Sequence, residues 1–217
     1  MNDHQKESQT LKHLQEEYHL DEGLLTSILL ADLSDKDFWP EPAESNCKER
    51  ASLNPVDIVP GKGDGNLFFG MSRKETEKLL GAPAMEDESS CYYELKMKSG
   101  RTDLVYQVVY REGKIEEFTL YDALNEDEPV QLHGINVFSE QAEEVIRQLE
   151  VYGEAKLDAE ERKMATQCEF DSLGLSLWRE KAFYDEMQEA PEYKNLSRED
   201  QNYEQSFRRF ATVTLKR

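Results

Sequence analysis

Alternation of apolar and polar residues dominates the middle of the chain. In residues 91–97 apolar side chains fall on every second position, and in residues 104–111 they occupy both sets of positions. A period of two predicts strands, and apolar residues on both sides predict a central strand. Gly113 accepts the positive φ of a tight turn, so residues 115–121 are predicted to return as a third antiparallel strand.

A helix with clear start and stop signals precedes this meander. The Ser72 side chain is placed to accept from the backbone N–H of Glu75, whose carboxylate is placed to accept from the N–H of Ser72. Gly81 and Pro83 then stop the helix. Residues 66–121 are therefore predicted to form a short strand, a helix and three antiparallel strands.

A similar order of elements follows. After a short strand, Ser139 is predicted as a helix N-cap and Gly153 as the helix stop. A hairpin over 166–179 and a last strand over 211–215 complete the chain. The stretch between them is acidic, bears tyrosines and is poor in aliphatic residues, which predicts a loop or an exposed helix.

The two serine caps and two helix-stopping glycines indicate an imperfect internal repeat of roughly seventy residues. Two copies are too few for a solenoid and are expected to form one compact body. We therefore predict an α+β fold of two helix-plus-antiparallel-sheet repeats with a helical N-terminal extension. The predicted parts are the extension over 1–33, an extended linker over 34–65, the first repeat over 66–124, and the second repeat with a C-terminal strand over 130–217.

Different signals predict the extension and the linker. Apolar residues between Ser8 and Leu33 recur every three or four positions, which indicates two short amphipathic helices. Prolines and glycines in 34–65 indicate an extended segment on the surface. Gly61–Gly65 favours a flexible turn over a phosphate loop, because that loop needs a lysine followed by Ser or Thr and then a helix.

The chain has a large excess of negative charge. Its 26 Lys+Arg and 46 Asp+Glu residues give a formal net charge of −20 at pH 7. Such a charge attracts cationic partners over long distances and repels nucleic acid and anionic lipid. We therefore expect a cationic protein partner, no nucleic acid and no membrane; the alternative is a generic acidic protein without an electrostatic partner.

The lack of a recognisable targeting signal and the spacing of the cysteines predict a cytoplasmic protein. The N-terminus lacks a basic segment leading into an apolar run, and the apolar cluster at 24–33 is too short to span a bilayer. Cys47, Cys91 and Cys168 form no close pair in sequence. This spacing is typical of free thiols in a reducing compartment.

Reactive groups are sparse. His13 and His19 are six residues apart and lie on different helix faces, so they do not form a metal pair. Cys91 and Cys168 have no histidine close in sequence, which leaves the distant His133 as a candidate base. We predict no metal, no cofactor and no enzymatic activity.

Candidate partner-binding residues come from two acidic loops and one tryptophan. The carboxylates are expected to steer a basic partner, which an aromatic centre then holds. Trp178 has two interpretations, an exposed interface anchor or a core residue, because tryptophan is enriched in hot spots and is also highly buried on average. The acidic candidates are Glu86, Asp87, Glu88, Glu126, Asp127 and Glu128.

Residues 59–83 carry a resemblance to a known family. Phe69–Ser72 followed by Leu80–Pro83 resembles the SmpA/OmlA outer-membrane assembly lipoproteins, in which Gly-Met-Ser/Thr precedes a helix that ends Leu-Gly-x-Pro. That fold is similar to β-lactamase inhibitor protein, which is built from two tandem helix-plus-sheet repeats. This chain shows no lipoprotein signal or lipidated cysteine, and it looks like cytosolic immunity proteins of bacterial toxin systems.

The resemblance implies an immunity protein that neutralises a cognate toxin by stoichiometric binding. The alternative is a structural or assembly adaptor that docks through its N-terminal helices, and an enzyme that uses Cys91, Cys168 and His133 ranks third. Deleting residues 1–33 separates the first two, because an adaptor would lose its partner. The sequence leaves open the partner, the oligomeric state and whether the repeats share one sheet.

Overall fold

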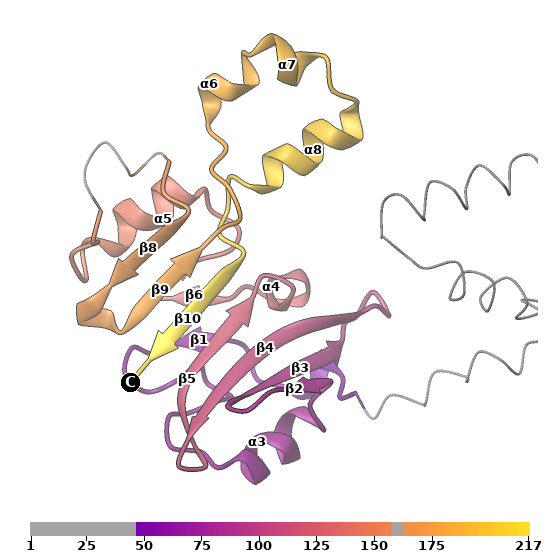
Figure 1. Cartoon of the computed structure of the whole chain (residues 1–217), viewed down its shortest axis with the longest axis vertical. Coiled ribbons are helices and arrows are strands. Elements are labelled where there is room, and N and C mark those ends of the chain that lie inside the picture. Colours follow the sequence, from indigo (N-terminus) through magenta and orange to yellow (C-terminus); the bar gives the residue numbers. More distant parts are fainter. Residues whose placement is uncertain (1–46, 158–161, 163) are drawn as a thin grey trace, which may run out of the picture. The chain divides into compact units, whose positions relative to one another are not determined.

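A seven-stranded antiparallel sheet is the larger of two layers (Figure 1). The computed structural model describes residues 47–157, 162 and 164–217, so the predicted helices of 1–33 and residues 34–46 of the predicted linker lie outside it. The described chain is α+β, and its last strand lies between the two halves of the sheet. The strand order is β2 (Met85–Glu86), β3 (Ser90–Lys96), β4 (Thr102–Arg111), β5 (Lys114–Tyr121), β10 (Thr212–Lys216), β9 (Leu175–Trp178) and β8 (Gln167–Phe170).

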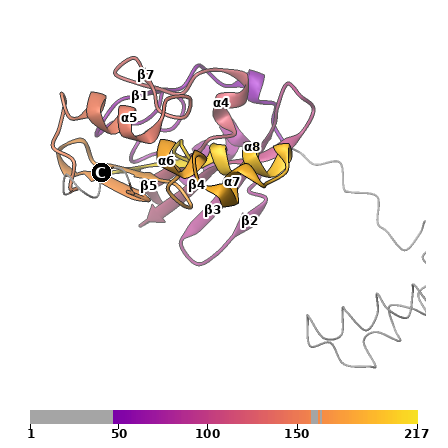
Figure 2. The same ribbon diagram turned by 90° about the horizontal axis from the view of Figure 1, so that it is seen from above.

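The second layer consists of short strands and helices. Its elements are η2 (Arg50–Ser52), β1 (Asp57–Ile58), α3 (Arg73–Leu80), α4 (Leu124–Asp127), β6 (Gln131–Leu132), β7 (Ile135–Asn136) and α5 (Ala142–Leu149). The strand β6 pairs with β1 in parallel and with β7 in antiparallel orientation, which gives a small three-stranded sheet. Figure 2 shows α4, α5, β1 and β7 on the same side of the large sheet.

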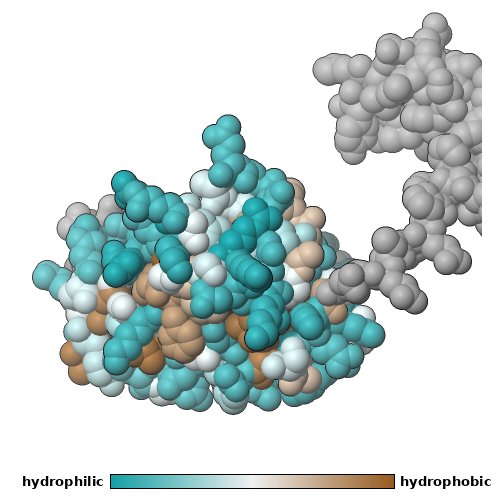
Figure 3. All heavy atoms as spheres, turned by 90° about the horizontal axis from the view of Figure 1, so that it is seen from below, coloured by the Kyte–Doolittle hydropathy of each residue, from teal (hydrophilic) through white to brown (hydrophobic). Residues whose placement is uncertain are grey.

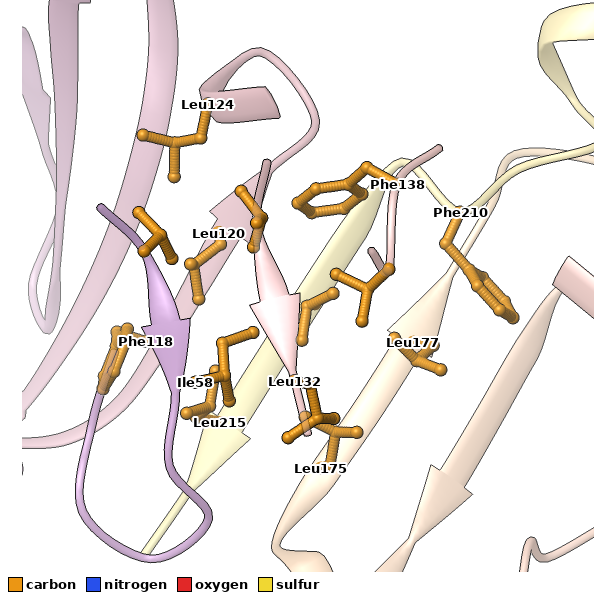
Figure 4. Close-up of a cluster of buried hydrophobic side chains, with 14 of the residues drawn as sticks. Ile58, Phe118, Leu120, Leu124, Leu132, Phe138, Leu175, Leu177, Phe210 and Leu215 are labelled. Atoms are coloured by element: carbon orange, nitrogen blue, oxygen red, sulfur yellow. The ribbon is translucent and has the colours of Figure 1, made fainter. Parts of the chain in front are cut away.

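One apolar core joins the two layers (Figure 4). Leu120 of β5, Val213 of β10 and Leu177 of β9 are paired in register and buried. Ile58 of β1 and Leu132 of β6 belong to the same cluster. Because this row of side chains crosses from β5 to β9, both halves of the chain bury their apolar surface together.

Local sequence signals account for the first helix. The Glu75 carboxylate accepts from the backbone N–H of Ser72 at 2.7 Å, and the Ser72 side chain accepts from the N–H of Glu75, so the predicted capping box is confirmed. Gly81 follows the helix with a φ of 92°. The meander β3–β4–β5 is also confirmed, and Gly113 has the predicted positive φ, 72°.

The second helix has different ends from those predicted. Gln141, not Ser139, is the N-cap of α5, and it makes no side-chain cap. Ser139 does not cap the helix because the Asn136 carboxamide oxygen accepts from its N–H and from that of Phe138, which folds this segment into a turn. The helix ends at Leu149, before Gly153.

Residues 47–65 differ from the predicted surface linker. Leu53, Val56 and Ile58 are buried in the common core, and Arg50 and Asp64 are buried as well. The segment packs into the core because β1 pairs with β6. These strands are distant in sequence, so no local pattern predicts their pairing. Gly61–Gly65 forms turns, as predicted.

A long connection, which we call the arm, spans residues 179–211 between β9 and β10. It contains α6 (Asp185–Gln188), α7 (Pro191–Lys194) and α8 (Arg198–Ser206), and it extends beyond the strand ends in Figure 1. The predicted hairpin is confirmed as β8–β9, where η3 (Asp171–Leu173) makes the turn, and the predicted last strand is β10.

Candidate protein-binding surface

The large sheet has one face over which no helix of the described residues lies (Figures 1 and 2). Side chains along each strand alternate between this face and the core. The pairing register brings the outward side chains into three rows, and we call this surface the open face. The first row is Met85, Tyr92, Gln107, Thr119, Thr214, Ser176 and Glu169, the second is Tyr121, Thr212, Trp178 and Gln167, and the third is Ser90, Val109, Glu117 and Lys216.

Aromatic side chains flank short polar ones on the open face. Trp178 is 43% exposed, whereas Leu175 and Leu177 of the same strand are buried, so the interpretation of Trp178 as a core residue is wrong. At the centre, the hydroxyl groups of Thr119 and Thr214 are hydrogen-bonded at 2.9 Å. Rigid Tyr and Trp side chains among small polar residues are typical of surfaces that bind proteins.

Asp87, a predicted binding residue, lies at the edge of the open face. Its carboxylate accepts from the backbone N–H groups of Ser89 at 3.0 Å and Ser90 at 2.8 Å, and these hydrogen bonds lower its pKa. The Tyr92 hydroxyl also donates to it at 3.4 Å and accepts from the Gln107 carboxamide at 3.1 Å. Asp87 therefore positions the Tyr92 ring.

The other two residues of the first acidic loop differ in their partners. The Glu86 carboxylate pairs with Arg73 of α3, which also pairs with Glu77 at 2.7 Å. Hydrogen bonds to Glu77 and Glu86 raise the pKa of Arg73. Glu88 is exposed and has no ion pair with any described residue. Part of the negative charge of this loop is thus neutralised within the molecule.

The second acidic loop binds the turn between β3 and β4. Asp127 accepts from the Lys98 backbone N–H at 3.0 Å, and Glu126 pairs with Arg101 at 3.0 Å. Glu128 lies 3.9 Å from the Lys98 ammonium. The two loops lie at opposite ends of β3, about 20 Å apart at the usual rise per residue of a strand, and they do not form one charged patch.

The structure does not bring the catalytic candidates together. Cys91 of β3 and Cys168 of β8 are buried and lie five strand spacings apart, about 24 Å. Burial raises the pKa of Cys168 to about 12. His133 lies in the turn between β6 and β7, where its ring stacks on Tyr152 at 4.0 Å. No thiol–imidazole pair is therefore present among these three residues.

Asp64 and Tyr106 form a buried polar cluster. The Asp64 carboxylate accepts from the Tyr106 hydroxyl at 2.6 Å and from the backbone N–H groups of Asn66 and Leu67 at 2.9 and 2.7 Å. Burial raises the pKa of both side chains. The cluster fixes the 61–67 turn against β4, and we assign it a structural role.

Two further properties concern metals and membranes. Within 47–157, 162 and 164–217, no group of three His, Cys, Asp or Glu side chains is arranged to hold a metal ion. None of the described helices is long and apolar enough to cross a membrane.

The side shown in Figure 3 is largely hydrophilic, with small separate apolar areas.

Comparisons with known proteins leave the family open. A scan against protein-family models gives no match, and searches of curated proteins and of solved structures give none either. The resemblance to SmpA/OmlA and immunity proteins therefore rests on the sequence motif alone.

The sequence contained a signal for the open face that residue-type motifs miss. The polar positions between the apolar ones include Tyr92 of β3, Gln107 of β4, Thr119 and Tyr121 of β5, and Thr212 and Thr214 of β10, and the charged positions are Glu94 and Lys96 on one side of this group and Glu117 and Lys216 on the other. Alternation shows that these residues share one face of each strand. Only the strand order shows that they share one surface with Trp178, with Tyr121 and Thr212 in the same row as the tryptophan.

Proposed function

We propose that this chain is a non-catalytic protein that binds one cationic partner protein stoichiometrically. We further propose that this partner is a toxin, which the chain neutralises by binding it. The observation that carries the proposal is the open face, with Tyr92, Tyr121 and Trp178 on a sheet surface over which no described helix lies. Aromatic side chains supply a large contact area at a low cost in conformational entropy.

The order of elements supports the tandem-repeat interpretation. The helix α3 is followed by β2 to β5, and α5 is followed by β8 to β10, and both sets of strands are antiparallel. Two helix-plus-sheet units that share one sheet are what the resemblance to β-lactamase inhibitor protein implies. We place the protein in the cytoplasm, where Cys91 and Cys168 remain reduced.

Charge supports the choice of a basic partner. The net charge of −20 attracts a cationic protein before contact, which raises the association rate, and the uncharged centre of the open face then provides short-range packing. We expect an association rate that falls as the salt concentration rises from tens to hundreds of millimolar, because salt screens exposed charges.

The test uses the full chain and the protein encoded beside its gene. We expect co-expression to relieve that protein's toxicity and sedimentation to show a one-to-one complex. Trp178→Ala and Tyr121→Ala should each weaken binding at least about tenfold, as expected for aromatic anchors. The matched control is Val151→Ala, an exposed apolar residue beyond α5. Equal binding by all three variants would rule out the open face as the interface.

A further inference from the structure

Tyr121 and Trp178 lie on either side of Thr212 in the second row of the open face. The register pairs Tyr121 with Thr212 and Thr212 with Trp178, so β10 lies between the strands of the two aromatic residues. At the usual strand spacing, the Cα atoms of Tyr121 and Trp178 are about 10 Å apart. We call the space above Thr212 and between these two side chains the slot.

The floor of the slot is recessed, although no described helix lies over this face. Thr212 is buried, and so is Ser176 in the neighbouring row, whereas Trp178 is 43% exposed. Short side chains between large ones cause this relief, because side chains stand roughly perpendicular to a sheet. A group midway in the slot lies about 5 Å from each aromatic residue, within the distance of about 6 Å over which a cation is attracted to a ring.

Polar groups around the slot make no hydrogen bond with any described residue. They are the Tyr121 hydroxyl, the Trp178 indole N–H, and the hydroxyl groups of Thr212 and Ser176. Burial raises the pKa of Tyr121, so its hydroxyl stays protonated at neutral pH. Tyrosine hydroxyls that are partly buried usually have a hydrogen-bond partner. The hydroxyl oxygens of the slot are therefore available to accept from N–H groups of a ligand.

Charge favours a cation as this ligand. The chain has a formal net charge of −20. Near the slot, Asp122 follows Tyr121 and Glu180 lies two residues after Trp178; both carboxylates are exposed, and neither makes an ion pair with any described residue. The intervening Arg179 is buried and donates to backbone carbonyl groups. A cation in the slot thus lies within the range of attraction of both carboxylates.

We propose that the slot receives an arginine side chain of the partner protein. This inference rests on the proposed function, and it names the contact by which the open face selects a basic partner. A guanidinium is planar, stacks on aromatic faces and carries several N–H donors, so it can lie between the rings and donate to the hydroxyl oxygens. A lysine ammonium is a compact and strongly hydrated charge without a flat face to stack.

The first experiment needs no knowledge of the partner. The probe is the peptide acetyl-Gly-Arg-Gly-amide, and its control is the same peptide with citrulline, which keeps the shape of the arginine side chain but carries no charge. The indole N–H signal of Trp178 is followed by NMR in the full chain, and its loss in Trp178→Phe assigns it. We expect the arginine peptide to shift this signal at least about three times as far as the citrulline peptide at equal concentration.

Variants of the chain test whether this shift comes from the slot. Tyr121→Leu should remove most of the shift because it removes an aromatic face, whereas Tyr121→Phe keeps the ring and should retain at least about half. The matched control is Tyr152→Leu, which changes a tyrosine that is 47% exposed beyond α5 and should leave the shift unchanged. No shift with the arginine peptide would overturn the inference. Equal shifts with both peptides would also overturn it, and would assign the slot to a neutral polar group.

The second experiment uses the partner identified by the co-expression test. Each arginine of that protein is replaced by alanine, and its affinity is measured for the wild-type chain and for Tyr121→Leu. We expect one replacement to weaken binding at least about tenfold with wild type and less than about twofold with Tyr121→Leu, because both changes remove the same contact. A complex in which no arginine shows this coupling would overturn the inference while leaving the proposed function intact. Absence of any complex would overturn both.

Discussion

At the scale of single residues, the buried pair Asp64–Tyr106 is the most sensitive point of the fold. Both side chains have no exposed surface, and their hydrogen bond of 2.6 Å joins residues that are distant in sequence. A buried polar atom that loses its partner retains the full cost of having left water. Changes here should therefore affect stability far more than changes to the surface acids.

Tyr106→Phe should destabilise the protein by about 1–3 kcal/mol, because it leaves a buried Asp64 oxygen without its donor. Urea denaturation monitored by circular dichroism measures this. Tyr92→Phe is the control, since its hydroxyl lies on the open face and its loss should cost less than about 0.5 kcal/mol. Similar losses for the two variants would show that the Asp64–Tyr106 hydrogen bond contributes little.

Asp64→Asn should change how stability depends on pH. Burial raises the pKa of Asp64 above its ordinary 3.8, so above pH 3.8 the unfolded chain releases this proton before the folded chain does. Ionisation then favours unfolding, and wild type should lose stability relative to Asp64→Asn as pH rises from 3.8 through the raised pKa. Unfolding free energies of both proteins between pH 4 and 8 measure the difference. A difference independent of pH would contradict this linkage.

At the scale of elements, two neighbouring residues of β9 have different roles, one in core packing and one in the proposed interface. Leu177 points into the core between Val213 and Cys168, whereas Trp178 points to the open face between Thr212 and Gln167. Alternation along the strand causes this difference. A short strand thus contributes to stability with one face and to the proposed interface with the other.

Leu177→Ala should cost about 2–5 kcal/mol, because it leaves a cavity in the core. Trp178→Ala should cost less than about 1 kcal/mol, since this side chain is 43% exposed. Thermal unfolding of both variants measures the contrast. A loss for Trp178→Ala as large as that for Leu177→Ala would assign the tryptophan to packing and not to binding.

At the scale of the whole molecule, β10 joins the two halves of the sheet. It pairs with β5 over five residue pairs and with β9 over four, while those two strands do not pair with each other. Val213 and Leu215 of β10 also lie in the common core. The last of the described strands is therefore central to the fold.

Removal of residues 212–217 should abolish cooperative folding of the whole described part, because β5 and β9 then each lose their neighbour. Calorimetry of the full chain should show one unfolding transition for 47–217, and the shortened chain should show none. As a control, Lys216→Ala/Arg217→Ala keeps the strand and should retain the transition. A shortened chain that still unfolds with native-like heat would mean that the halves fold independently.

Many elements of the fold follow from local sequence patterns. The capping box at Ser72, the turn at Gly113 and the alternation of β3 to β5 follow from interactions between residues close in sequence. The sequence also predicted correctly a hairpin for β8–β9 and a final strand. These features depend on neighbours within about four residues or on the period of two, so a sequence contains their causes.

The candidate surface was predicted only in part, and the reason is again physical. Trp178 and the acidic residues are visible in the sequence, but whether a carboxylate is free or paired depends on residues such as Arg73 and Lys98 that only folding brings near. The inward turn of residues 47–65 depends on pairing between β1 and β6 in the same way.

By itself, then, the sequence determined the period and punctuation of individual elements and the sign of the net charge. Tertiary structure decided the strand order, with β10 between β5 and β9, and it thereby decided which side chains share the open face. Pairing of distant strands is set by the burial of a common core. That burial is a property of the assembled molecule and not of any segment.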